Sequence, residues 1–184
     1  EIRTRFEVIK RDAIIDNLKA VAAGGNKKKL DKELKKRLAQ IDDDYDFIAK
    51  CNIGGEFMDP ELIKRVEQIA SIRWQRTIDN RLGISQDELK RKGRRSKAKL
   101  PVNEPLLNDR SDHIIPYDAA EKKGYDESFG FRLEFPEHKY NQGEVYNLSI
   151  ARGTLTAEER FKINDHIMQT ISMLEQLPFP KHLA

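Results

Sequence analysis

His166 is the residue of this sequence whose type and position are most suited to chemistry. It lies in a stretch with helical periodicity, in which four apolar residues gather within about 80° of the helix surface at about 100° per residue. These four are Ile163, Ile167, Ile171 and Leu174. His166 falls about 60° outside this cluster, with Thr170 between the two. The pattern predicts an imidazole and a hydroxyl, four residues apart, on the flank of a buried face.

Two interpretations of His166 stay open from this pattern. The first is a half-buried histidine whose ring hydrogen-bonds to a carbonyl. The second is a metal ligand, because neutral imidazole is the commonest protein ligand for transition metals. A catalytic metal needs about three protein ligands, and no second histidine or paired His-Asp lies close to His166 in the sequence. Asp165 is expected to point about 100° away from it.

The other candidate sites are weaker. Cys51 is the only cysteine, which excludes an intrachain disulfide and a thiolate zinc site, and it closes an apolar stripe where it is expected in the core. Residues 90–99 include seven basic residues but no interleaved aromatic ones, so we expect a solvated loop and no nucleic-acid partner. The acidic residues 42–46 lack EF-hand spacing and indicate a charged helix face. Asp112 and His113 are expected in a solvated turn.

Composition limits the classes of protein further. The 184 residues are 38% apolar and 35% charged with a net charge of +3, enough for one domain with a narrow core or for two small ones. No run of about 18 apolar residues occurs, so we expect no membrane-spanning segment in this chain. With its single cysteine, the chain is expected to be cytoplasmic. It begins at Glu1 already in helical pattern, and we expect a piece of a longer protein.

The first third of the chain predicts a helical hairpin and a further helix. Apolar residues at helical spacing run through 1–23 and again through 28–51, separated by a Gly-Gly-Asn turn at 24–26. Two such helices joined by a short turn are expected to pack antiparallel. Asp59 then caps a third helix that starts at Pro60.

The remainder of the chain predicts less regular structure and one long helix. A short polar helix is expected to start at Ser85, inside a charged and Pro-rich segment. Alternating apolar residues predict a strand over 129–135, and 145–150 is either a second strand or a turn of helix. The capping box at Thr156 opens a last helix over 157–177. The fold class is therefore mainly α, a helical hairpin plus further helices, with an irregular middle and a minor β element.

The segment 144–181 resembles a known family. Its turn Gly153-Thr154-Leu155-Thr156 followed by Glu159 is similar to the G-x-L-T-x-x-E turn of HD-GYP phosphohydrolases, which leads into a helix bearing a histidine. The segments 1–8 and 52–58 look like a subgroup of that family with a long insertion. The resemblance implies three segments: 1–78 is insertion-like, 79–143 is irregular, and 144–184 is part of an HD-type catalytic core.

The resemblance also implies a chemistry. Members of the family are all-helical phosphodiesterases that bind iron or manganese through His and Asp, and many hydrolyse cyclic di-GMP. By position, His166 matches the metal-binding histidine, although the family commonly has Gly where Thr170 stands. The family's His-Asp pair would precede Glu1, and its His-His pair and G-Y-P loop would follow Ala184. We therefore expect an inner fragment of such an enzyme that is inactive alone, and we assign it no catalytic residue.

A second class of function stays open beside this one. The long apolar stripes of 1–51 are also typical of a non-catalytic module for interaction, dimerisation or signal relay. In that case the two helices would form a homo-oligomer, with Leu34 at its seam.

Overall fold

The computed structural model describes residues 1–93, 99–118, 121 and 133–177. Within these ranges the chain is mainly helical with two small antiparallel sheets, which confirms the predicted fold class. The described helices include none that is both long and apolar enough to cross a membrane.

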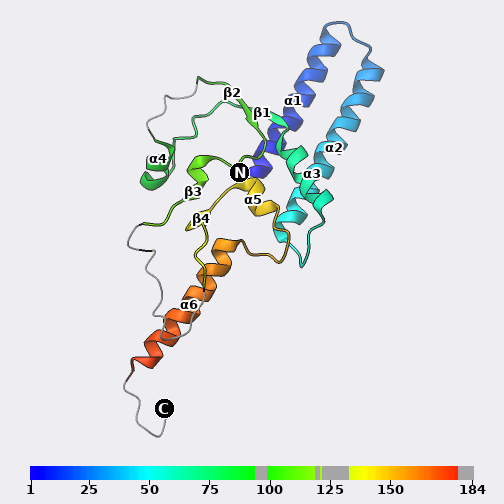
Figure 1. Cartoon of the computed structure of the whole chain (residues 1–184). Coiled ribbons are helices and arrows are strands. Elements are labelled where there is room, and N and C mark those ends of the chain that lie inside the picture. The colour runs from blue at the N-terminus through cyan, green and yellow to red at the C-terminus, as the bar shows by residue number, and fades with distance from the viewer. Residues whose placement is uncertain (94–98, 119–120, 122–132, 178–184) are drawn as a thin grey trace.

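The hairpin is the most extended part of the molecule. Helices α1 (Ile2–Ala22) and α2 (Lys27–Ile53) run antiparallel and project away from the other elements (Figure 1). The turn between them needs glycine twice: Gly24 has a φ of +87°, and a Cβ on Gly25 would lie 2.8 Å from the carbonyl oxygen of Ala20. The turn and both helices therefore form where the sequence predicts them.

The core lies at the base of this hairpin, where helix α3 (Pro60–Ala70) packs beside it. Asp59 caps α3 by accepting a hydrogen bond from the backbone N–H of Glu61 at 2.8 Å. Val66, Leu106 and Leu107 are the most completely buried side chains of the described chain. Phe6, Ile9, Ile41, Ile48, Ile69 and Leu148 join them in the same cluster.

Two short sheets and a short helix follow. Strand β1 (Arg73–Arg76) pairs antiparallel with β2 (Val102–Pro105), and β3 (Ile114–Ile115) pairs antiparallel with β4 (Tyr140–Asn141). Helix α4 (Gln86–Lys92) lies between β1 and β2 in sequence. These four strands were not predicted from the sequence, because runs of two to four residues carry almost no periodicity.

The predicted strand over 129–135 has a mixed outcome. Residues 129–132 lie outside the described residues, while 133–135 are described and belong to no strand, so that part of the prediction is wrong. The alternative of a helical turn over 145–150 is confirmed as helix α5 (Glu144–Leu148).

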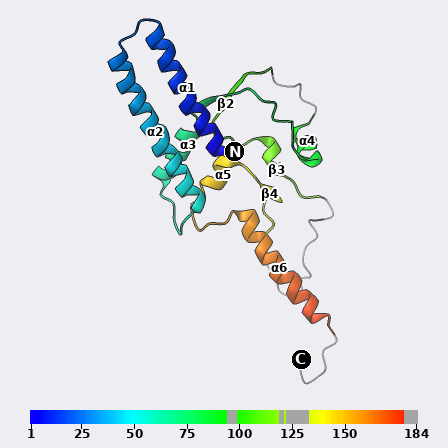
Figure 2. The ribbon, with the colours of Figure 1, turned by 180° about the vertical axis from the view of Figure 1, so that it is seen from behind.

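Helix α6 (Ala157–Glu175) ends the described chain and extends away from the hairpin, on the opposite side of α5 (Figures 1 and 2). It follows a one-turn 3-10 helix, η1 (Ser111–His113), and the strands β3 and β4 in sequence. The elements that bear on His166 are therefore α5, the turn from 149 to 156, and the segments that pack on α6.

Candidate functional site

One face of α6 is anchored by aromatic packing. The ring centroid of Phe161 lies 4.8 Å from that of Phe135 and 6.4 Å from that of Tyr117, and Phe135 and Tyr117 meet edge to face at 5.7 Å. Met168, two turns further along the same face, is also buried. Aromatic pairs at such distances stabilise by about 0.5–1.5 kcal/mol beyond the area they bury. This cluster fixes the rotation of α6 about its axis.

The N-terminus of α6 is capped as the sequence predicts. Thr156 Oγ1 accepts a hydrogen bond from the N–H of Glu159 at 3.2 Å, and the Glu159 carboxylate accepts one from the N–H of Thr156 at 3.0 Å. The buried carboxylate of Glu158 accepts a hydrogen bond from the Tyr146 hydroxyl at 2.9 Å. Burial and this bond raise the pKa of Tyr146. The start of α6 is therefore tied to α5.

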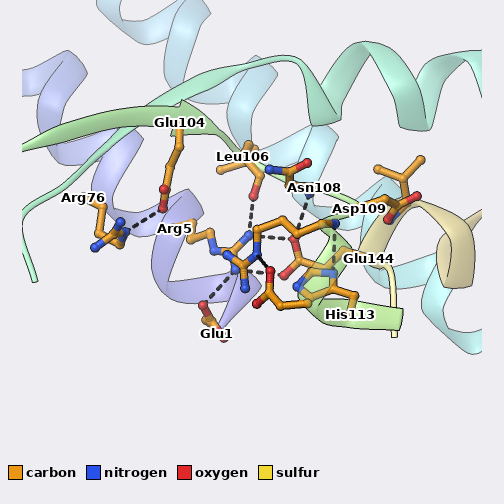
Figure 3. A network of polar contacts seen from close by, with 12 residues as sticks. Glu1, Arg5, Arg76, Glu104, Leu106, Asn108, Asp109, His113 and Glu144 are labelled. Carbon is orange, nitrogen blue, oxygen red and sulfur yellow. Dashed lines mark hydrogen bonds and ion pairs between the residues drawn. The ribbon is translucent and has the colours of Figure 1, made fainter. Parts of the chain in front are cut away.

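Helix α5 is in turn held by a buried ion pair (Figure 3). The two terminal nitrogens of Arg5 each donate to one oxygen of Glu144 at 2.8 Å, and one of them also donates to the carbonyl of Leu106 at 2.6 Å. The N–H of Asn108 adds a further hydrogen bond to Glu144 at 2.9 Å. Arg5 also pairs with Glu1 at 2.8 Å, and this bond lowers the pKa of Glu1.

Asp109 completes the attachment of α5. Its carboxylate accepts hydrogen bonds from the N–H groups of Val145 at 2.9 Å and Tyr146 at 3.1 Å, as an N-terminal cap does. Gly143 is required beside it, because a Cβ there would lie 2.5 Å from Asp109 Oδ1. A continuous set of polar contacts thus runs from α1 through α5 to the start of α6. This network was not predicted from the sequence.

His166 lies on the opposite side of α6 from this anchored face, and it is exposed. The expected half-buried histidine is therefore wrong. Within the described part of the chain the imidazole has no hydrogen bond or ion pair. The hydroxyl of Thr170 donates to the carbonyl oxygen of His166 at 2.9 Å, so it satisfies the helix backbone instead of the ring.

The apolar strip beside His166 is also exposed, against the expectation that it is the buried face. All four of its residues count among the exposed large hydrophobic side chains, and Ile167 is 55% exposed. The neighbouring Met168 is only 7% exposed. The correction has a simple cause: α6 has two apolar faces, and the one with Phe161 is the one that meets Tyr117 and Phe135. The strip consists of Ile163, Ile167, Ile171 and Leu174, and we call it the α6 strip.

The described residues do not form a metal site by themselves. None of their His, Cys, Asp and Glu side chains gather in groups of three or more that could hold a metal ion. A catalytic metal needs about three protein ligands, so a lone imidazole such as that of His166 does not fit one. His182 lies outside the described residues, and Nε2 of the partly buried His138 lies 3.7 Å from a carboxylate oxygen of Glu137.

The expected solvated turn at Asp112 and His113 is wrong as well. Asp112 is partly buried and accepts a hydrogen bond from Lys92 Nζ at 3.0 Å. Burial and the nearby Arg110 guanidinium lower the pKa of His113 below its ordinary value of 6.5. Lys92, which was expected in a solvated basic loop, ends α4 and has a side chain only 9% exposed; residues 94–98 of that run lie outside the described residues.

The acidic residues within 42–46 lie on α2, as expected for a charged helix face. Two of them hold α3 in place. Arg65 pairs with Asp43 at 2.5 Å and with the buried Asp44 at 3.2 Å. Cys51 is only partly buried, so the expectation of a core cysteine holds in part. Burial raises the pKa of its thiol.

Comparison with protein families adds to this geometry. The segment from β2 to the last residue carries the capped turn, the anchored helix and His166. Residues 101–184 match the HD domain. The match supports an HD-domain family, and through it the superfamily of metal-dependent phosphohydrolases. The HD-domain match leaves out the hairpin, α3, β1 and α4. Searches of curated proteins and of solved structures gave no match.

Proposed function

We propose that this chain is an inner part of an HD-type, metal-dependent phosphohydrolase, and that His166 is one ligand of its metal centre. The observation that carries the proposal is the position of His166 within the HD-domain match. It is exposed, on a helix that is capped and packed on one side, and it stands beside an uncovered apolar strip. The other ligands then come from outside the described residues.

The α6 strip supports this arrangement. Single exposed apolar residues are normal on a protein surface, whereas a contiguous exposed patch marks a contact site. Helices that cover the strip would stand next to His166, which is where further His and Asp ligands are needed. The resemblance to HD-GYP enzymes makes iron or manganese the expected metal and a cyclic dinucleotide the expected substrate. Such a metal, when bound, lowers the pKa of water so that hydroxide is present near neutral pH.

The residues of this chain do the positioning in that proposal. The Thr156 cap and the Tyr146–Glu158 hydrogen bond hold the start of α6. The packing of Phe161 sets its rotation, and with it the direction of His166. In the same proposal 1–78 is insertion-like and 144–184 belongs to the catalytic core. The charged, Pro-rich segment 79–143, which was expected to be irregular, stands between them and carries α4 and the strands β2 to β4.

A comparison of two polypeptides tests the proposed function. Purified 1–184 is expected to show no metal-dependent hydrolysis of cyclic di-GMP, while a longer polypeptide that includes the flanking coding sequence is expected to hydrolyse it. Robust turnover by 1–184 alone would refute the assignment to an inner part. Absence of His and Asp ligands from the flanking sequence would refute the metal centre.

The hairpin supports a second candidate function, a homo-oligomeric interaction module. Helix α1 exposes three large apolar residues on its outer face, Ile14, Ile15 and Leu18. On α2, Leu34 is half-buried, so the exposed apolar residues of α1 make the better seam. Sedimentation of Leu18→Glu tests this candidate: a shift from dimer to monomer supports it, and an unchanged monomer in both proteins contradicts it.

A further inference from the structure

A cavity of about 380 Å³ lies where α2 ends, between the start of α3 and the turn that precedes α6. Two backbone hydrogen bonds join its walls. The N–H of Met58 donates to the carbonyl oxygen of Ala151 at 3.1 Å, and the N–H of Gly153 donates to the carbonyl oxygen of Glu56 at 3.1 Å. Gly54 has a φ of +75°, and a Cβ there would lie 2.9 Å from Thr154. The cavity is thus held in shape by the fold.

The lining of this cavity is apolar. Aliphatic, aromatic and sulfur-containing side chains form its inner wall: Phe47, Cys51, Met58, Leu148 and Ile150. Its rim has two of the most exposed apolar side chains of the described chain, Ile53 at 78% and Phe57 at 66%. Covering such a side chain gains about 1.5–3 kcal/mol when burial is complete. Both the wall and the rim therefore favour an apolar occupant.

One charge stands in this lining. Lys50 lines the cavity, and its ammonium group makes no ion pair with any residue in the described ranges. The uncharged polar side chains of the lining are few, and they include Asn52 and Asn147. A ligand with many polar groups would leave most of them unpaired, at a cost of about 1–3 kcal/mol each. A ligand with one anionic group matches the single cation.

We propose that this cavity binds an amphipathic monocarboxylic acid, with its alkyl tail against the apolar wall and its carboxylate at Lys50. The volume lies within the range of about 300–1,000 Å³ that small-molecule sites occupy. The cavity is lined by α2, α3, α5 and the segments that join α2 to α3 and α5 to α6. The inference does not use the proposed metal ligand, because His166 is not among the lining residues.

Calorimetric titration of the chain with dodecanoate, below its micelle concentration, tests the proposal. We expect saturable one-to-one binding. Butyrate has the same head group without the tail, and it is expected to bind more than about a hundredfold less tightly, because each buried methylene contributes about 0.8 kcal/mol. Dodecyltrimethylammonium has the same tail with the opposite charge, and it is expected to bind less tightly than dodecanoate. Equal affinity for the two detergents would overturn the role of Lys50.

Two variants with matched controls locate the site. Lys50→Gln is expected to weaken dodecanoate binding about two- to fivefold, the worth of an exposed ion pair, while Lys64→Gln, outside the cavity, leaves it unchanged. Ile53→Ser is expected to weaken dodecanoate binding about tenfold. Ile78→Ser, at a similarly exposed residue that does not line the cavity, leaves it unchanged. No saturable binding, or equal loss in the variants and their controls, overturns the proposal. If dodecanoate does not bind and the chain forms a dimer that Ile53→Ser dissociates, the occupant of the cavity is a second copy of this chain, which also overturns the proposal.

Discussion

Substitution of two adjacent residues of α6 by alanine is expected to lower the stability of this chain by very different amounts. Met168 is 7% exposed, so Met168→Ala deletes a packed side chain and is expected to lower the free energy of unfolding by about 2–3 kcal/mol. Ile167 is 55% exposed, so less than half of its burial gain of about 1.5–3 kcal/mol is realised. Alanine also has a higher helix propensity than isoleucine, which offsets about 0.4 kcal/mol of this loss. Ile167→Ala is therefore expected to cost about 0.3–1 kcal/mol.

Urea denaturation of the two variants and the parent chain, followed by far-UV circular dichroism, measures both values. The two substitutions lie on one helix and remove side chains of similar size, so differences in helix length or salt cancel. An Ile167→Ala loss as large as that of Met168→Ala would contradict the account, because it would mean that the α6 strip is covered within this chain. A self-association that hides the strip is excluded by repeating the measurement at several protein concentrations.

Three further predictions concern the parts that hold α6 in place. Arg5→Met leaves the Glu144 carboxylate without its buried partner and is expected to lower the free energy of unfolding by about 3 kcal/mol in urea denaturation. Adding Glu144→Gln to this variant is expected to recover at least about 1 kcal/mol. Strictly additive losses in the double variant would contradict the ion pair. Leu34→Glu is expected to lower the free energy of unfolding by about 1–2 kcal/mol in the same assay without changing the sedimentation profile. A shift to smaller species would instead place the apolar stripe of α2 at an oligomer seam. Folding lowers the pKa of His113, so the unfolded chain binds the proton at a higher pH than the folded chain does. The free energy of unfolding is therefore expected to fall as the pH drops below 6.5. His113→Asn should reduce this fall, and an unchanged pH profile in the variant would contradict the role of His113.

The helix ends were predictable because capping is local in sequence. Asp59 and Thr156 each cap a helix through the N–H of a residue two or three positions further along, and both bonds form as predicted. The hairpin turn at Gly24 is local in the same way. Such features need no knowledge of the rest of the fold.

The orientation of α6 was not predictable from its own residues. Periodicity showed an apolar face at Ile163 and Ile167, but the face that is packed is the one with Phe161 and Met168. The choice is made by Tyr117 and Phe135, which lie far from Phe161 in sequence. The pattern could reveal that α6 is helical and capped, and it could not reveal which face its neighbours cover.

The ion pair that holds α5 joins residues 139 positions apart, so no local pattern predicts it. One signal was nevertheless present. Arg5 interrupts the stripe of Ile2, Phe6 and Ile9, and a charged residue among buried positions requires a partner. The pattern could thus indicate that Arg5 is paired, whereas the identity of Glu144 required the fold.

The metal content of the longer polypeptide tests the central claim most directly. Elemental analysis of the protein with its flanking sequence, purified with manganese, would compare the wild type with His166→Ala and with His138→Ala, a control at a second, partly buried histidine. We predict that His166→Ala loses bound metal and that His138→Ala retains it. With metal removed from both proteins, His166→Ala is expected to unfold thermally like the wild type, since the exposed ring makes no hydrogen bond or ion pair in the described part of the chain. Full metal occupancy in His166→Ala would contradict the role of His166 as a metal ligand.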